Sequence, residues 1–161
     1  MSSMAVRVLR LIALVVLLVV PALCPMPLHA KPDVVARHWV ILDATNGRVV
    51  AEQAARQPVA IASLTKVMTA LVALERGQLD ETVTIVPEDL VGESSAGLRA
   101  GQTVTLRALL YGLLLRSGND AAMAIARAVG GSPHQEDPVA RARFVGWMNA
   151  KAAALGLDQT H

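Results

Sequence analysis

The feature that most constrains the fold is the stretch of residues 60–74, AIASLTKVMTALVAL. Ser63 and Lys66 are three positions apart, so on a helix their Cβ atoms lie about 5–6 Å from each other on one face. Ala70 and Ala73 continue this face with small side chains, and the larger apolar side chains fall on the other faces. Such a helix is typically enclosed by the rest of a protein. We therefore predict a buried helix that presents a hydroxyl and an amine together.

The pairing of Ser63 with Lys66 has a chemical consequence. Burial of a lysine disfavours its ammonium form, and a neutral amine one turn from a serine can accept the proton of the hydroxyl. Ser63 would then be a nucleophile and Lys66 its base. The alternative is a serine that caps a helix and is followed by a solvated lysine, because Ser-x-x-Lys is a short pattern.

The charge of the chain gives no sign of a nucleic-acid partner. The net charge is +2, from 15 basic and 13 acidic residues, and both surplus charges, Arg7 and Arg10, precede residue 31. Aromatic residues make up only 2% of the chain, and no run is rich in lysine and arginine. We therefore expect that the protein does not bind nucleic acid.

Cysteine and histidine argue against two further kinds of site. The single cysteine, Cys24, lies near the start of the chain, so no thiol catalysis or cysteine metal site is expected beyond it. The histidines are scattered without the spacing of metal ligands, and we expect no metal site. They are His29, His38, His134 and His161.

Residues 1–30 are predicted to be an export signal. A basic start is followed by an unbroken apolar run over residues 11–20, three prolines and a small residue, Ala30, at a possible cleavage point. The run is short for a bilayer span. A retained membrane anchor and a lipid anchor on Cys24 are the alternatives, and in each case the protein would work outside the cytoplasmic membrane. The rest of the chain, residues 31–161, is expected to form one domain.

The remaining chain predicts an α+β fold. Two strands over residues 38–43 and 48–51 are joined around Asn46-Gly47, which is typical of a β-hairpin. The central helix is expected to end at Arg76, with Gly77 as its C′ residue. A short strand over residues 82–86 and a loop over residues 92–101 follow, and then three more helices. We expect these to lie over 106–114 behind a Thr105 cap, over 121–129 behind Asp120, and from a loop with Pro133 and Pro138 towards Leu155.

A second motif, Ser117-Gly118-Asn119, lies between two of the predicted helices. A loop at such a place can direct side chains towards a cleft. Ser117 and Asn119 could also merely end one helix while Asp120 caps the next, and this is the role that we prefer for Asp120.

Together the two motifs resemble those of the penicillin-interacting serine enzymes, which are marked by Ser-x-x-Lys, a Ser-x-Asn-type element and Lys-Thr-Gly. The segments around them, residues 61–69 and 114–122, are similar to the D-alanyl-D-alanine carboxypeptidases, peptidase family S11. Residues 148–151 and 155–161 resemble the same family. The resemblance implies a β-lactamase/transpeptidase-like fold, in which an antiparallel sheet packs with a helical lobe.

The resemblance also implies a mechanism, without metal or organic cofactor. Ser63 would attack the penultimate D-alanine carbonyl of a peptidoglycan stem peptide, and Lys66 would accept its proton. Ser117 would help to pass the proton to the departing D-alanine, and Asn119 would bind the substrate backbone. A β-lactam mimics the D-Ala-D-Ala end and should acylate Ser63.

One element of the family is missing from this sequence, because no Lys-Thr-Gly or Lys-Ser-Gly occurs in it. In the family this triad lies on a sheet strand that also supplies an oxyanion-hole donor, and losing one such donor costs about 100- to 1000-fold in rate. We therefore expect an incomplete fold, a hairpin and helical lobe without the C-terminal strands, from a fragment that is inactive or severely impaired.

Three alternatives stay open. The first is a D-alanyl endopeptidase of the same family. The second is a class A β-lactamase, against which the region after Asn119 has no Glu-x-x-x-Asn arrangement and only one glutamate, Glu136. The third is a catalytically silent envelope protein that binds cell-wall peptide.

Overall fold

The computed structural model describes residues 34–161, so the predicted export signal lies outside the described residues. The chain divides into two compact units, one ending at Gln57 and one spanning residues 58–161, and each is described by itself. Within the described part, no helix has the length and apolar character needed to cross a membrane.

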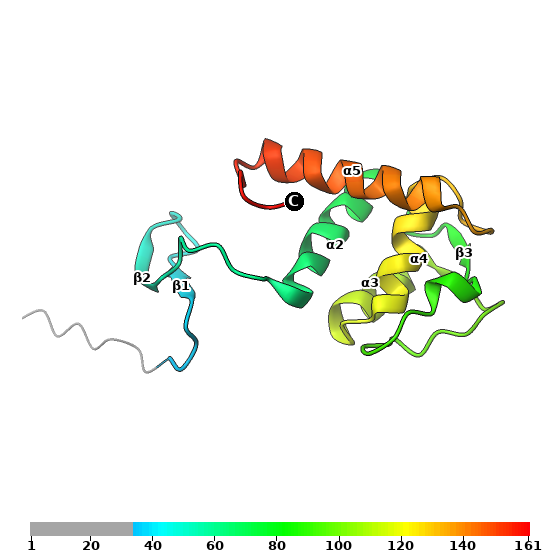
Figure 1. Cartoon of the computed structure of the whole chain (residues 1–161), viewed down its shortest axis with the longest axis horizontal. Helices are drawn as coiled ribbons and strands as arrows, with labels where there is room; N and C mark the ends of the chain where they lie inside the picture. Colours follow the sequence, from blue (N-terminus) through cyan, green and yellow to red (C-terminus); the bar gives the residue numbers. More distant parts are fainter. Residues whose placement is uncertain (1–33) are drawn as a thin grey trace, which may run out of the picture. The chain divides into compact units, whose positions relative to one another are not determined.

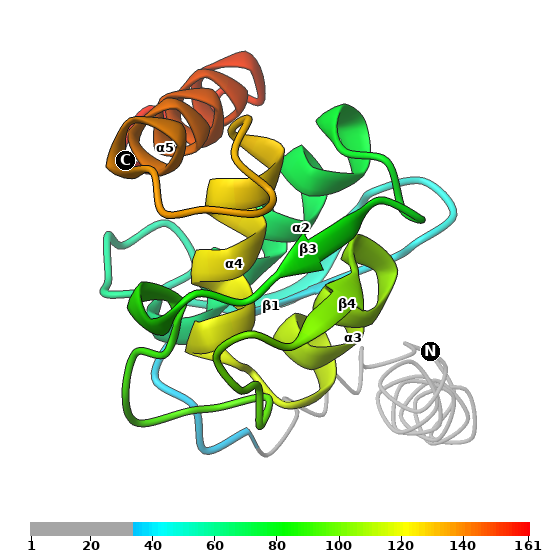
Figure 2. The same ribbon diagram turned by 90° about the vertical axis from the view of Figure 1, so that its right-hand side faces the viewer.

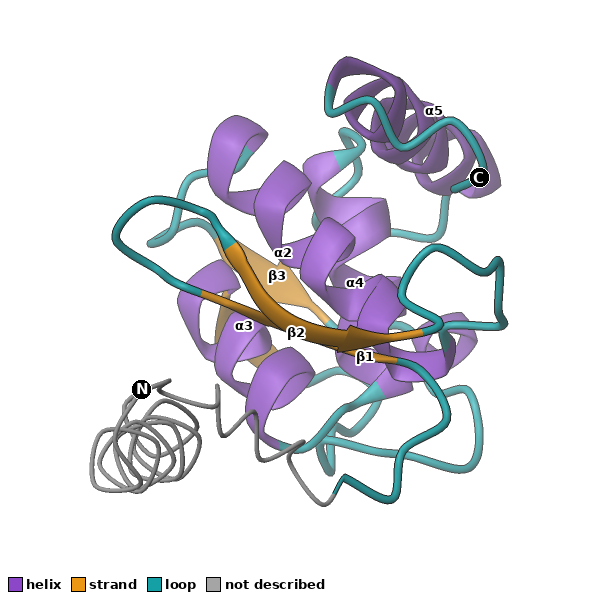
Figure 3. Ribbon diagram, turned by 90° about the vertical axis from the view of Figure 1, so that its left-hand side faces the viewer, coloured by secondary structure: helices purple, strands orange, loops and turns teal. Residues whose placement is uncertain are grey.

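The first unit contains the expected hairpin. Strands β1 (Trp39–Leu42) and β2 (Val49–Gln53) pair in antiparallel fashion (Figure 3). The turn between them depends on Gly47, whose φ of +71° lies in the left-handed region that favours glycine. Its N–H donates to the Asp43 carbonyl over 2.8 Å, and this closes the turn. The prediction from Asn46-Gly47 is therefore confirmed.

The second unit is built around one helix, α4 (Asn119–Val129), which contacts the three other α-helices of the unit (Figure 1). Its alanines explain the close packing, since Ala121 and Ala124 are fully buried. The neighbours are α2 (Thr65–Arg76), which follows the 3-10 turn η1 (Ala62–Leu64), α3 (Leu106–Leu115) and α5 (Pro138–Ala154).

A second small sheet lies beside these helices. Strand β3 (Thr82–Thr84) pairs antiparallel with β4 (Thr103–Thr105), as Figure 2 shows. Between them lie the turn η2 (Pro87–Asp89) and the loop over residues 92–101. Strand β4 was not predicted, because three residues carry too little alternation to be distinguished from the cap of the next helix.

Apolar residues from all these elements form one core. Its members come from every α-helix of the unit and from β3, and the largest are fully or almost fully buried. They include Val72, Val83, Ile85, Leu106, Leu109, Leu113, Ile125 and Phe144.

The boundaries of α4 and α5 differ from the prediction. Helix α4 begins at Asn119 behind Gly118, so Asp120 is not its N-cap. Pro138 is the first residue of α5 rather than part of the loop, and the Asp137 carboxylate caps this helix by accepting from the Val139 N–H over 2.9 Å. Proline suits this position because its missing N–H would have no partner there.

Helix α2 ends at Arg76, as predicted, and Gly77 follows it in an extended conformation, with a φ of −93°. Glycine is needed there because a Cβ would lie 2.4 Å from Leu106 Cδ2. The expectation that α2 is enclosed is wrong for one of its faces, since the apolar side chains there are exposed. These are Val67, Leu71 and Leu74, and the exposed Leu64 of η1 precedes them.

Candidate active site

Ser63 and Lys66 lie together, as their spacing predicted, although Ser63 belongs to the turn η1 and Lys66 to the first turn of α2. The Lys66 Nζ donates to Ser63 Oγ over 3.3 Å. Lys66 is buried, with 9% of its surface exposed, whereas Ser63 is exposed. The exposed serine thus lies beside a lysine that is largely shielded from water.

Asn119 brings the second motif to the same place. Its Oδ1 accepts from Lys66 Nζ over 2.8 Å, although 53 positions of sequence separate the two residues. Its Nδ2 donates to the Gly92 carbonyl over 3.1 Å. The amine of Lys66 thus lies between the Ser63 hydroxyl and the Asn119 carboxamide.

Ser117 lies in the connection between α3 and α4, two positions before Asn119, and is half-buried. Within residues 34–161, no hydrogen bond joins its hydroxyl to Ser63 or Lys66. The structure therefore links Ser63, Lys66 and Asn119 directly and places Ser117 on the adjoining backbone.

Backbone strain is concentrated around these residues. Ala62, Glu93 and Ser117 have φ values of +45°, +70° and +54°, in the left-handed region that non-glycine residues rarely occupy. Ala62 precedes Ser63, Glu93 follows the Gly92 whose carbonyl Asn119 contacts, and Ser117 is itself a candidate; the fourth such residue within residues 34–161, Ala54, lies in the other unit. Strain of this kind gathers at functional sites, where the surrounding structure maintains it.

The arrangement suits nucleophilic catalysis by a hydroxyl. A hydroxyl within hydrogen-bond reach of an amine, which is itself oriented by a third group, has the general form of an activated nucleophile. The described residues contain no group of three histidine, cysteine or acidic side chains that could bind a metal ion.

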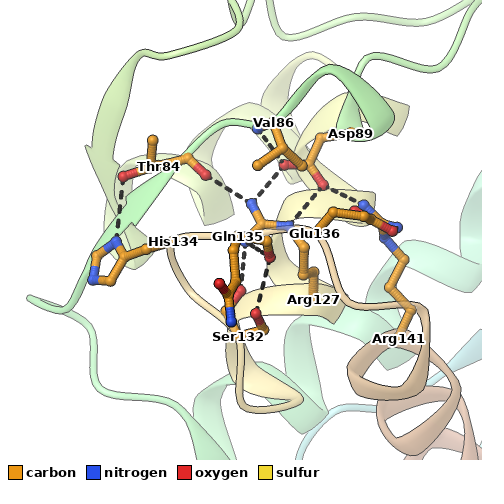
Figure 4. Close-up of polar contacts among 9 residues, drawn as sticks. All are labelled: Thr84, Val86, Asp89, Arg127, Ser132, His134, Gln135, Glu136 and Arg141. Atoms are coloured by element: carbon orange, nitrogen blue, oxygen red, sulfur yellow. Dashed lines mark hydrogen bonds and ion pairs between the residues drawn. The ribbon is translucent and has the colours of Figure 1, made fainter.

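A buried ionic network that sequence analysis did not predict surrounds Arg127, near the C-terminal end of α4 (Figure 4). Arg127, which is fully buried, donates to Asp89 through Nε over 3.2 Å and through Nη2 over 2.7 Å. Arg141 donates to the same carboxylate over 2.8 Å. Burial alone would raise the pKa of Asp89, but these hydrogen bonds outweigh it and lower the pKa below its usual value.

This network joins segments that are distant in sequence. Arg127 also donates to the carbonyls of Thr84, Ser132 and Gln135, so one side chain connects β3, α4 and the loop before α5. An arginine within an alanine-rich helix is the only sequence signal that could have indicated it, because a charge on a buried face needs partners.

Comparison with known proteins places the chain in a family. The profile of the D-alanyl-D-alanine carboxypeptidases, peptidase family S11, matches residues 27–161. The chain belongs to this family. Its similarity to D-alanyl-D-alanine carboxypeptidase DacB2 of Mycobacterium tuberculosis is 42% identity over 134 residues, covering 81% of this chain and 42% of the relative. D-alanyl-D-alanine carboxypeptidase DacC of Escherichia coli is 36% identical over 141 residues, which cover 80% of this chain and 33% of that relative.

Solved structures agree with the family assignment. The DD-transpeptidase of Streptomyces K15 is similar with a TM-score of 0.74 and 36% identity, over 81% of this chain and 52% of that one. A penicillin-binding protein homologue of Mycobacterium tuberculosis is similar with a TM-score of 0.63 and 41% identity, over 78% of this chain and 44% of that one. The expected fold class is therefore confirmed, with the hairpin and helical part present. The chain spans about half the length of these structures.

Proposed function

We propose that the chain is the nucleophile-bearing part of a serine D-alanyl-D-alanine carboxypeptidase that acts on peptidoglycan stem peptides. The observation that carries the proposal is the continuous contact from Ser63 to Lys66 to Asn119. Membership of the carboxypeptidase family supports the substrate class. The export signal expected at residues 1–30 supports a location in the periplasm or on the outer face of the cytoplasmic membrane of a bacterium.

The proposed reaction begins with attack of Ser63 Oγ on the carbonyl carbon of the penultimate D-alanine. Lys66 Nζ, 3.3 Å away, accepts the hydroxyl proton as the new C–O bond forms. The peptide bond then breaks, the terminal D-alanine leaves with a proton passed through Ser117, and an acyl-enzyme remains. Water hydrolyses this ester and restores the Ser63 hydroxyl.

Asn119 has two tasks in this proposal. Its carboxamide oxygen accepts from the Lys66 amine and so orients it, and Asn119 also binds the backbone of the substrate. No Lys-Thr-Gly occurs in the 161 residues, so the chain supplies the nucleophile and base and not the sheet-borne part of the site. We therefore expect slow acylation.

Acylation by a β-lactam tests the proposal. The full chain is incubated with a fluorescent penicillin, and the adduct is detected by fluorescence and by intact mass. We expect one adduct on Ser63 that is lost in S63A and strongly reduced in K66A. S94A is the matched control, because Ser94 is an exposed serine near the site whose side chain has no proposed role.

A folded chain that forms no adduct would contradict the enzymatic proposal. Circular dichroism on the same sample establishes that it is folded. That result would instead favour a silent protein that binds cell-wall peptide, and a stem peptide ending in D-Ala-D-Ala would then be the ligand to titrate. With an active sample, release of D-alanine from a pentapeptide and from a cross-linked dimer separates carboxypeptidase from endopeptidase activity.

A further inference from the structure

Asp120 is a buried carboxylate that the proposed reaction does not use. It is 1% exposed, and all its hydrogen-bond partners in the described residues are donors. No ion pair involves it within residues 34–161. Burial alone would raise the pKa of Asp120, but hydrogen bonds from backbone N–H groups and a hydroxyl lower it below its usual value. The side chain is therefore a charged acceptor held by donors alone.

Most of these donors come from the loop that precedes β4. The Ser95 hydroxyl donates over 2.6 Å, the Ala96 N–H over 2.8 Å and the Leu98 N–H over 3.3 Å. The remaining donor is the Ala121 N–H of α4 itself, at 2.8 Å. Asp120 thus attaches residues 95–98 to the first turn of α4.

Two glycines make room for this attachment. A Cβ on Gly118 would lie 2.8 Å from the Ala96 nitrogen, and a Cβ on Gly112 would lie 2.8 Å from the Ala96 Cβ. Both distances are too short for real atoms. Glycine at these positions therefore lets Ala96 lie against the connection between α3 and α4, where Asp120 can reach its N–H.

The other end of the same loop contacts Asn119. The Ser94 carbonyl accepts from the Asn119 N–H over 2.7 Å, and the Gly92 carbonyl accepts from Asn119 Nδ2 over 3.1 Å. A carbonyl can only accept, so it selects the amino end of the carboxamide. The oxygen end is left facing Lys66, whose Nζ donates to it over 2.8 Å. If the carboxamide were flipped, its oxygen would face the Gly92 carbonyl oxygen and its N–H₂ group would face the Lys66 amine.

We propose that Asp120 is a positioning residue for the active site. Its carboxylate holds the loop over residues 92–98 so that the Gly92 carbonyl fixes the Asn119 carboxamide with its oxygen towards Lys66. The inference rests on the proposed function, because it assumes that an oriented Lys66 matters for acylation of Ser63. Asp120 touches neither substrate nor nucleophile and acts through Asn119.

D120N tests this at nearly constant size, because it places an amide N–H₂ among groups that are all donors. We expect penicillin acylation of the full chain to fall on the order of 10- to 100-fold. Loss of the groups that orient metal ligands in metalloproteins has an effect of this size. D89N is the matched control, since Asp89 is also a buried carboxylate of the same unit. It should lower the unfolding temperature and leave the acylation rate of the folded protein unchanged.

A double-mutant cycle separates positioning from a general loss of structure. If Asp120 acts through Asn119, N119A and N119A/D120N acylate at the same rate. If N119A and D120N instead lower the acylation rate by factors that multiply in the double variant, the inference is overturned. If D120N does not fold, S95A takes its place, because it removes one donor to Asp120 and should lower the rate in the same direction.

The Asn119 carboxamide supplies a readout that needs no activity. In ¹⁵N-labelled wild-type protein, the Nδ2 proton bonded to Gly92 should exchange slowly with solvent, and D120N but not D89N should speed this exchange. If the wild type is not acylated at all, the proposed function fails, while this comparison still decides the positioning role. Unchanged exchange in D120N would overturn it.

Discussion

At the residue scale, the conformation of Ser117 is as informative as its hydroxyl. The residue has a φ of +54°, where a side chain is strained, between two well-formed helices. The next N–H, that of Gly118, donates to the Gly112 carbonyl over 3.1 Å, which ends α3 and turns the chain towards α4. A glycine would adopt this conformation without strain, and the role proposed above for the Ser117 hydroxyl would account for the serine.

Comparing S117G with S117A separates the two properties of this residue. Both variants lose the hydroxyl, but only glycine relieves the left-handed strain, so S117G should be more stable than S117A by about 1–2 kcal/mol. Urea denaturation measures this difference. Acylation by penicillin should fall to a similar extent in both. Equal stabilities of the two variants would show that the strain has no energetic consequence.

At the element scale, α3 and α5 begin where a side chain accepts from one of the first N–H groups, whereas α2 and α4 begin without a side-chain cap. Thr105 accepts from the Ala108 N–H over 3.2 Å at the start of α3, as the sequence predicted. Asp137 does the same for α5, where Pro138 occupies the first helical position. Gly130 then lets α4 and α5 approach, since a Cβ there would lie 2.1 Å from the Ala140 carbonyl oxygen.

The cap of α5 gives a prediction for this scale. D137A should lower the free energy of unfolding by about 0.5–2 kcal/mol, because the Val139 N–H loses its acceptor. D137N is the matched control and should stay close to wild type, since asparagine caps helices about as well as aspartate. Thermal or urea unfolding followed by circular dichroism measures both. If D137N lost as much free energy of unfolding as D137A, the charge of Asp137 and not its capping hydrogen bond would be the stabilising feature.

At the scale of the whole second unit, the Asp89 network joins elements that are distant in sequence. The turn η2, β3, α4, the loop before α5 and α5 itself all contribute a partner (Figure 4). Breaking a buried ion pair leaves an uncompensated charge, which is why such pairs are costly to remove even where they add little net stability.

D89N should therefore destabilise the unit by about 3–5 kcal/mol near neutral pH. The pKa of Asp89 is lowered in the folded state, so its contribution is present above the unfolded carboxyl pKa of about 4 and disappears as the pH falls through the folded value. The difference between wild type and D89N should shrink on acidification below pH ~4. Urea denaturation at several pH values measures it.

D80N is the control for this prediction. Asp80 pairs with Arg107 at the surface, with 87% and 51% of the two side chains exposed. Exposed pairs contribute about 0–1 kcal/mol, so D80N should change stability little at any of these pH values. A loss in D80N as large as in D89N would refute the distinction between the buried and the exposed pair.

The sequence by itself determined what depends on local spacing: the hairpin at Asn46-Gly47, the stripe and cap of α3, and the placement of Ser63 with Lys66 on one helix face. Tertiary structure decided what depends on distant partners. Only the fold brought Asn119 to Lys66, gave Asp120 the donors of residues 95–98 and surrounded Arg127 with acceptors. Periodicity specifies which side of a helix is apolar, but burial and hydrogen bonding depend on which elements pack there. The exposed apolar face of α2 shows the same limit.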